Sequence, residues 1–259
     1  MDDPPAAPEK LTLMARFFLP REKFRGDHAI IDGQELAHLG RVLRLRAGDA
    51  VTLFDDSGRE HDAVIDSLTE SRGELTIVRS YETGRDPALP ITLAVGLTKG
   101  EKLDFVVEKA TELGVGAVVP FRSAYSVPKL NNEKIATRTE RWRKIAVSAA
   151  KQCGRGRVPQ IQPVCDFREL IDRPWADTLK ILCWEKETDR SLQQIFEKHR
   201  EPKALLLAVG PEGGFTAEES EAATSKDFLT VQIGRRILRA ETAALTALAL
   251  AQHLWGDLK

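Results

Sequence analysis

Two glycine-bearing loops in the last third of the chain carry the residues best suited to hold a ligand. The first loop, Gly210-Pro-Glu-Gly-Gly214, follows the apolar run 204–209. Its paired glycines let the backbone approach a bound molecule because no Cβ stands in the way. Thr216 and Glu219 have the spacing of a capping box, which predicts a helix from residue 217. An ordinary strand-to-helix turn would also explain this loop, so the second loop decides between the two interpretations.

The second loop combines positive charge with apolar side chains. Gly234 ends the apolar run 229–233, and Arg235-Arg-Ile-Leu-Arg239 follows before an alanine-rich helical stretch. A solvated basic turn, with Glu241 in the first turn of a helix, is the simpler explanation. Apolar residues inside a polar loop instead favour a pocket that grips a flat ring among backbone polar groups. Both loops would then lie at the carboxyl edge of a parallel sheet, where open α/β sheets bind ligands.

A strand–helix–strand unit supplies the sheet that would carry these loops. Residues 91–97 are expected to form a buried strand. Residues 99–102 lead into an amphipathic helix that runs to about residue 113, and residues 117–121 are the next strand. This spacing predicts a βαβ unit and therefore a parallel sheet of the α/β class. Further strands are expected at 158–164, whose two prolines indicate an edge position, and at 180–185.

The first third of the chain predicts a separate, β-rich domain. Short strands are expected at 28–32, 50–54, 62–66 and 74–78, and their even spacing indicates a small barrel, interrupted by a helix over residues 34–43. Residues 1–13, rich in Asp, Pro and Ala, are expected to be a disordered leader. A linker is expected at 83–90 because glycine and proline gather there, which gives domains of residues 14–84 and 85–259.

The two loops also carry a resemblance to a known family. Gly210-Pro-Glu-Gly-Gly214 and Ile233-Gly-Arg-Arg-Ile-Leu-Arg-Ala-Glu-Thr-Ala243 resemble the signature of the SPOUT methyltransferases, and the likeness extends over nearly the whole chain from Met14. Within that class the chain looks most like the bacterial enzymes that methylate N3 of a uridine in 16S ribosomal RNA. The resemblance implies an α/β parallel sheet with a C-terminal trefoil knot, preceded by a small PUA-like, RNA-binding β-barrel. The knot is implied by the resemblance alone, because threaded topologies are rare.

The resemblance further implies S-adenosyl-L-methionine as the cofactor, no metal, and a set of residues that would hold the cofactor. Most occupy matching positions of the two loops, whereas the match at Trp184 and Glu185, at the end of the strand 180–185, is looser. The set is Trp184, Gly210, Pro211, Glu212, Gly213, Gly214, Ile233, Gly234, Leu238, Thr242 and Ala243. Thr242 would bind through its hydroxyl group.

The implied reaction moves a methyl group from a sulfonium to a uracil nitrogen, while the protein supplies position and electrostatics. Because N3 carries a proton, we expect a base beside it and cations that stabilise negative charge on the uracil oxygens. Arg239 is the first candidate cation, and Arg155, from this chain or a partner subunit, is the second. Glu212 and Glu241 are the carboxylates of the two loops. Either could take the proton, but Glu241 could equally begin a helix and Glu212 position the cofactor.

Positive charge in this chain is local. With 38 Lys and Arg against 39 Asp and Glu, an RNA partner must meet a local patch. The stretch 134–157 is strongly biased to Lys and Arg, which favours phosphate contact over a merely solvated helix face. The candidate RNA-binding residues are Arg16, Arg41, Arg44, Arg46, Arg155 and Arg157. Those of the N-terminal domain could equally form a solvated charged face.

Composition narrows the possible sites and the location. The three cysteines form no CxxC pair and the five histidines are scattered, which argues against a disulfide framework or a metal site and favours a cytoplasmic protein. We expect no membrane association, because no apolar run is long enough to span a bilayer. Neither GxxxxGK[ST] nor GxGxxG is present, which disfavours a nucleotide-dependent enzyme.

The favoured interpretation is a homodimer that methylates 16S ribosomal RNA of the small ribosomal subunit, with the alanine-rich final helix as a contact surface. One alternative is a sister SPOUT enzyme acting on transfer RNA, which the N-terminal barrel and the Gln152-Cys-Gly-Arg155 turn disfavour. The other is a non-catalytic RNA-binding or ribosome-assembly factor. Binding of S-adenosylmethionine would separate an enzyme from such a factor. Free RNA and the assembled subunit both stay open as substrates.

Overall fold

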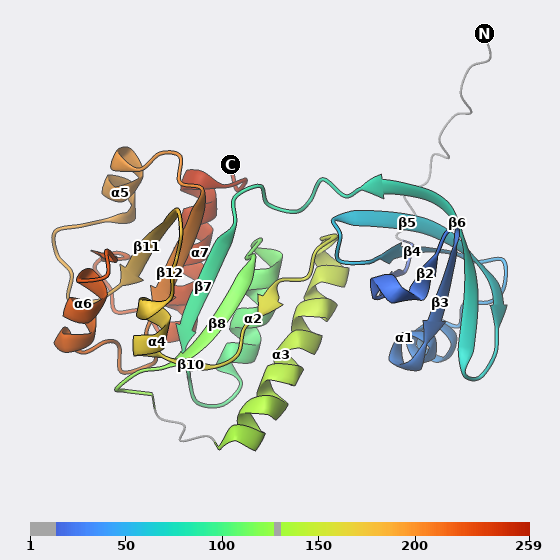
Figure 1. Ribbon diagram of the computed structural model, residues 1–259, viewed down its shortest axis with the longest axis horizontal. Coiled ribbons are helices and arrows are strands. Elements are labelled where there is room, and N and C mark those ends of the chain that lie inside the picture. Colours follow the sequence, from blue (N-terminus) through green and yellow to red (C-terminus); the bar gives the residue numbers. More distant parts are fainter. Residues whose placement is uncertain (1–13, 127–130) are drawn as a thin grey trace, which may run out of the picture. The chain divides into compact units, whose positions relative to one another are not determined.

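The chain folds into two compact units (Figure 1). The computed structural model describes residues 14–126 and 131–259, so the leader expected at residues 1–13 lies outside the described residues. One unit holds the residues up to Gly84 together with Gly154–Arg157, and the other holds Arg85–Cys153 and Val158–Lys259.

The first unit is built on a curled six-stranded sheet, a half-barrel. Its strand order is β1 (Arg16–Phe18), β4 (Ala50–Phe54), β5 (Arg59–Leu68), β6 (Arg72–Glu82), β3 (His28–Asp32) and β2 (Phe24–Arg25). β1 and β4 are parallel, and the other neighbours are antiparallel. Successive side chains of a strand point to opposite faces, so Phe17, Leu53 and Leu75 share one buried core. The short strands predicted for this region are therefore present.

The helix predicted over residues 34–43 forms as two shorter pieces. α1 (Gly33–Ala37) runs directly into a π-helical segment, η2 (His38–Val42), and a 3-10 turn, η1 (Arg21–Lys23), precedes β2. Leu36 and Leu39 anchor the two pieces on the core of the sheet. Arg44 then adopts a left-handed backbone with φ of 56°, which a helix cannot continue through.

Four residues from much further along the chain complete the first unit. The Gly58 amide donates to the carbonyl of Gly156 at 3.3 Å, and Arg16 Nη2 donates to the carbonyl of Arg155 at 3.2 Å. A Cβ on Gly156 would lie 2.8 Å from the Gly58 carbonyl carbon and 2.7 Å from Thr83 Cγ2, so only glycine fits. The boundary predicted at residue 84 places this segment in the other domain, and no local pattern signals its docking.

The second unit is a wholly parallel α/β sheet. Its strand order is β10 (Cys165–Asp166), β8 (Ala117–Arg122), β7 (Ile91–Gly96), β12 (Ala204–Val209), β11 (Thr178–Cys183) and β13 (Leu229–Val231), and β9 (Gln160–Ile161) also pairs with β8. All of these pairs are parallel. The edge position predicted for residues 158–164 is correct, although only Gln160–Ile161 forms a strand within that range.

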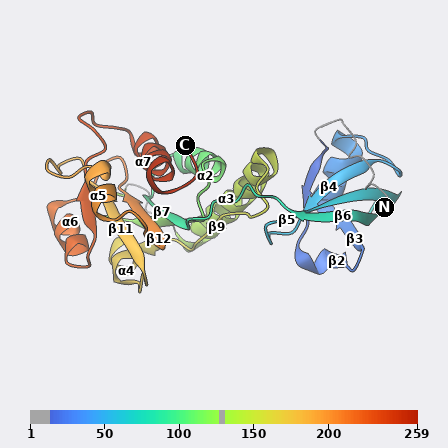
Figure 2. The same ribbon diagram turned by 90° about the horizontal axis from the view of Figure 1, so that it is seen from above.

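Helices cover both faces of this sheet, and Figure 2 shows α2 and α7 on the side opposite α4 and α6. One core joins alternate strand residues such as Leu93 and Leu207 to α2 (Lys102–Glu112), α3 (Asn132–Cys153), α5 (Leu192–Lys198) and α7 (Ala240–Trp255). The other core joins the intervening residues Ala94 and Leu206 to α4 (Phe167–Asp172) and α6 (Ala217–Thr224). Burial on both faces explains why these strands are continuously apolar in the sequence.

The final helix is a core element of the second unit. Ala244, Ala247 and Ala251 are fully buried against the sheet. Gln252, also buried, donates through Nε2 to the carbonyls of Leu113 at 3.0 Å and Gly114 at 3.1 Å, and so satisfies the carboxyl end of α2. The small residues of α7 therefore serve close packing within the chain.

Candidate functional site

Three neighbouring strands of the second unit end level with one another. β11 lies between β12 and β13, and Cys183 pairs with both Val209 and Val231. The segments that follow these three strands consequently emerge at one place on the carboxyl edge of the sheet. The two glycine-bearing loops do meet there, with the end of β11 between them.

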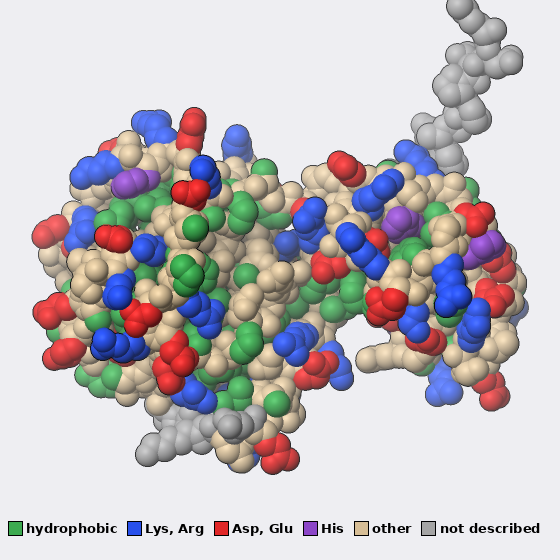
Figure 3. Space-filling view, in the orientation of Figure 1, with side chains coloured by type: hydrophobic (Ala, Val, Ile, Leu, Met, Phe, Trp, Pro, Cys, Tyr) green, Lys and Arg blue, Asp and Glu red, His purple; other side chains and the backbone are tan. Residues whose placement is uncertain are grey.

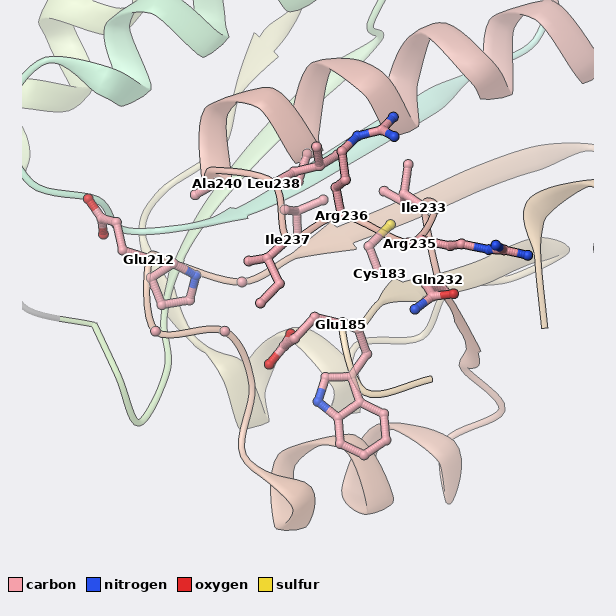
Figure 4. A pocket seen from close by; sticks show the side chains of 18 residues that line it. Cys183, Glu185, Glu212, Gln232, Ile233, Arg235, Arg236, Ile237, Leu238 and Ala240 are labelled. Carbon is pink, nitrogen blue, oxygen red and sulfur yellow. The ribbon is translucent and has the colours of Figure 1, made fainter. Parts of the chain in front are cut away.

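A pocket of about 230 Å³ lies at this edge, and Figure 4 shows it from close by. It is lined by Cys183, Trp184, Glu185, Val209, Gly210, Pro211, Glu212, Gly213, Gly214, Gln232, Ile233, Gly234, Arg235, Arg236, Ile237, Leu238, Ala240 and Ala243. The enclosure is mixed apolar and polar, as expected for a small-molecule site.

Every residue predicted to hold the cofactor lines this pocket except Thr242, which lies exposed on the first turn of α7. The lining also includes Gln232, Arg235, Arg236 and Ile237, which the predicted set omits. Arg235, Arg236 and Ile237 stand inside the second loop and Gln232 directly precedes Ile233, so their position beside predicted residues was the available signal. Cys183 and Val209 join the lining through the register of β11 and β12, and Ala240 joins it as the first residue of α7.

The glycines of the first loop are required by close contacts. Gly214 has a φ of +70°, and a Cβ there would lie 2.7 Å from Glu185 Oε1. A Cβ on Gly213 would lie 2.6 Å from Tyr125 Cβ, and a Cβ on Gly96 would lie 2.4 Å from the nitrogen of Pro211. The loop is thus fixed between β7, β11 and the segment after β8, with its backbone facing the pocket.

The helix that follows this loop begins as the sequence predicts. Thr216 Oγ1 accepts from the Glu219 amide at 3.1 Å, and Glu219 Oε2 accepts from the Thr216 amide at 3.0 Å. Glu219 also accepts from the Ala124 amide at 2.8 Å through Oε1, so the cap ties α6 to the segment after β8. The capping box predicted at residues 216–219 is confirmed and holds the carboxyl side of the loop.

A lysine outside both loops joins their carboxylates. Lys102 Nζ donates to Glu212 Oε1 at 2.8 Å and lies 4.0 Å from Glu241 Oε2. The Lys99 amide also donates to Glu212 Oε1, at 3.2 Å. Burial raises the pKa of Glu212, but the hydrogen bonds from Lys102 and from backbone amides outweigh burial and hold that pKa below its ordinary value. Glu212 is therefore ionised, and its carboxylate already accepts hydrogen bonds from Lys102 and from backbone amides.

Glu241 and Arg239 differ from Glu212 in having unsatisfied polar atoms. Glu241 Oε2 is buried and has no hydrogen-bond partner among residues 14–126 and 131–259. Arg239 is exposed at the N-cap of α7 and forms no ion pair with any described residue. Its charge lies close enough to Lys102 to oppose the rise in the pKa of Lys102 that the hydrogen bond to Glu212 causes. Neither residue is part of the pocket lining itself, which reaches Ala240 and Ala243 beside them.

The arginines predicted to bind RNA fall into two groups. Arg41, Arg44, Arg46 and Arg157 are exposed. Arg16 is ion-paired with Glu60 and stacks over Phe54 at 4.8 Å, and Arg155 is only 5% exposed within the first unit. The structure thus places Arg155 in the first unit, whereas Arg239 belongs to the second.

Two further properties concern the part of the chain that the structure describes. It contains no group of three or more His, Cys, Asp or Glu side chains arranged to hold a metal ion. Among the described helices, none combines the length and the apolar character needed to cross a bilayer.

Comparison with known proteins places these features in a family. An RNA methyltransferase domain matches residues 85–252, and an RNA methyltransferase PUA domain matches residues 31–78. The ribosomal RNA small subunit methyltransferase E of Bacillus subtilis is 33% identical over 247 residues, covering 93% of this chain and 96% of the relative. The chain belongs to this family of RNA methyltransferases. The Synechocystis protein of the same name is 32% identical and covers 83% of this chain and 69% of its own length.

A solved structure of the family has the same fold. The ribosomal RNA small subunit methyltransferase E of Neisseria gonorrhoeae, bound to S-adenosyl methionine, superposes with a TM-score of 0.86 at 36% identity and covers 95% of this chain and all of its own. The predicted fold class is confirmed: a parallel α/β sheet consistent with the SPOUT fold, preceded by a PUA-like unit built on a half-barrel sheet.

Proposed function

We propose that this protein transfers a methyl group from S-adenosyl-L-methionine to N3 of a uridine in 16S ribosomal RNA of the small subunit. The observation that carries the proposal is the pocket at the ends of β12, β11 and β13, which both signature-like loops line. The names of the relatives support small-subunit ribosomal RNA as the substrate. The ligand of the gonococcal structure supports the cofactor. The choice of N3 of a uridine rests on the resemblance of the loops.

The residues of the pocket fit this cofactor. The backbone of Gly213 and Gly214 lines the pocket without side chains of its own, while Ile233 and Leu238 provide apolar surface beside the backbone of the second loop. When bound, the cofactor would supply a methyl group activated on a sulfonium. The chain would orient that group and keep water from it, with Trp184 closing the side nearest β11.

Catalysis in this proposal falls to residues at the start of α7. Arg239, exposed and without an ion pair in the described chain, would stabilise negative charge on the uracil oxygens as N3 loses its proton. Glu241 would receive that proton, directly or through water, because its Oε2 has no hydrogen-bond partner among the described residues. Glu212 would position the cofactor loop, since Lys102 and the Lys99 amide already hold it.

Substrate contact in this proposal falls to exposed arginines. Arg41, Arg44, Arg46 and Arg157 would bind phosphate groups of the RNA, whereas Arg16 and Arg155 would hold the segment 154–157 within the first unit. On the face in Figure 3, positive and negative side chains of the second unit are interspersed. A cytoplasmic location follows from the proposed substrate.

A homodimer completes the proposal. Phe105 on α2 is 48% exposed and Leu250 on α7 is 39% exposed. These apolar side chains leave the outer surface of that helical layer suited to a second subunit.

The experiment is transfer of radiolabelled methyl from S-adenosylmethionine to three substrates: small subunits lacking the modification, naked 16S ribosomal RNA and transfer RNA. Arg239→Ala is assayed in parallel, with Arg168→Ala as the matched control because Arg168 is 89% exposed on α4, outside the pocket. We expect labelled N3-methyluridine in the ribosomal RNA, loss of about 10²–10³ in rate for Arg239→Ala, and native activity for Arg168→Ala.

The outcomes separate the alternatives. Label only in transfer RNA would move the substrate to a sister group while keeping the cofactor. Absence of transfer to all three substrates, together with no cofactor binding by calorimetry, would overturn the proposal and leave an RNA-binding factor.

A further inference from the structure

The charged side chains that line the pocket differ in whether an opposite charge lies beside them. Glu185, Glu212, Arg235 and Arg236 are its charged lining residues. Glu212 is neutralised by Lys102 at 2.8 Å. Both arginines are exposed, and Figure 4 shows their guanidinium groups directed away from Glu185. Within the described lining, Glu185 is therefore the carboxylate that no neighbouring cation balances.

The carboxylate of Glu185 is held over the glycine turn of the first loop. Glu185 is the second residue after β11, and its Oε1 and Oε2 lie 2.7 Å and 2.9 Å from the position that a Cβ on Gly214 would occupy. Glycine at residue 214 thus makes room for the carboxylate as well as for the left-handed backbone. Figure 4 shows Glu185 facing Ile237 across the pocket. No hydrogen bond or ion pair joins this side chain to the described residues, so its charge faces the cavity.

We propose that Glu185 selects the cationic methyl donor over the demethylated product. This inference rests on the proposed function. S-adenosylmethionine carries a positive sulfonium, and transfer of its methyl group turns that sulfur into the neutral thioether of S-adenosylhomocysteine. The remaining groups of the two molecules are the same. A carboxylate whose charge faces the cavity attracts the cationic donor and loses this attraction once the methyl group has left. Glu185 is thereby a specificity-determining residue that favours release of the product.

The test is isothermal calorimetry of the full chain with S-adenosylmethionine and, separately, S-adenosylhomocysteine. The variant is Glu185→Gln, which keeps the size of the side chain and removes its charge. Glu218→Gln is the matched control, because Glu218 is an exposed carboxylate in the first turn of α6 and does not line this pocket. Thermal melting of each variant checks that the fold is intact.

For Glu185→Gln we expect affinity for S-adenosylmethionine to fall roughly fivefold, which is the loss expected for a charge pair still in contact with solvent. Affinity for S-adenosylhomocysteine should stay within error. Glu218→Gln should change neither affinity. Equal loss for both ligands would overturn the inference, because it would place the carboxylate on a group that the two molecules share. No change for either ligand would also overturn it. Failure of the unaltered protein to bind S-adenosylmethionine would instead refute the proposed function, and the inference with it.

Discussion

Lys102 and Glu212 connect two elements that are 110 residues apart in the chain, with Lys102 Nζ 2.8 Å from Glu212 Oε1. Lys102 is the first residue of α2, where the positive end of the helix dipole disfavours a cation. The contact with Glu212, and the 4.0 Å approach to Glu241 Oε2, compensate for that placement. One lysine thus holds the first loop and faces the start of α7.

Removal of the Lys102 charge should loosen the first loop. In Lys102→Met the Glu212 carboxylate keeps only backbone amides as donors, the Lys99 amide among them, and Glu241 loses the cation that lies 4.0 Å from its Oε2. We expect severalfold weaker binding of S-adenosylmethionine, measured by calorimetry. Lys102→Arg keeps the charge and should recover most of the affinity. Native affinity in Lys102→Met would show that the loop does not depend on this contact.

The same contact predicts a pH dependence of stability. Hydrogen bonds from Lys102 and backbone amides hold the pKa of Glu212 below its ordinary value of 4.5, against the opposing effect of burial. A carboxylate with a depressed folded-state pKa contributes stability above its unfolded-state pKa and loses that contribution as the pH falls through the folded-state value. The native protein should therefore be more stable than Glu212→Gln at pH 7, and the difference should shrink below about pH 4.5. Urea unfolding across this range measures it, and a constant difference would refute the assignment.

A pair of glycine substitutions separates backbone strain from crowding in the pocket. Gly214 has a φ of +70° and Gly234 one of +105°, so alanine at either position is strained, by about 1–2 kcal/mol. Only at residue 214 would the new Cβ also displace Glu185, since no atom lies within 4 Å of a Cβ at residue 234. Gly214→Ala should destabilise the protein more in urea unfolding and should weaken cofactor binding more. Equal effects of the two substitutions would mean that Glu185 moves aside freely.

Local pattern predicted much of this architecture. The range 204–209 is the strand β12, the helix after it begins at Ala217 as its capping box indicates, and the strand expected at 91–97 is β7. These predictions succeed because burial, capping and turn chemistry act between residues close in sequence. The same local signals marked the two loops, and nearly all residues to which the resemblance assigns cofactor binding line the pocket.

The remainder of the site depends on contacts between distant residues. The order β12–β11–β13 brings Glu185 between the two loops, but a single sequence does not determine which strands become neighbours. Lys102 gave no signal, because a lysine at the start of an amphipathic helix is usually a solvated residue. Docking of Gly154–Arg157 in the first unit likewise depends on Gly58 and Thr83, about 70 to 100 residues away in the sequence.

That docking gives the last prediction. Gly156 has an ordinary backbone conformation, so the cost of Gly156→Ala comes from contacts: the new Cβ would meet the Gly58 carbonyl carbon at 2.8 Å and Thr83 Cγ2 at 2.7 Å. Overpacking of this kind costs about 1–3 kcal/mol, and separation of the segment should expose the Gly58 amide, which now donates to Gly156. Hydrogen exchange should therefore show faster exchange at Gly58 than in the native protein. Gly40→Ala is the control, because no atom lies within 4 Å of a Cβ there. Unchanged protection at Gly58 in Gly156→Ala would show that the segment is held by Arg16 and its other contacts alone.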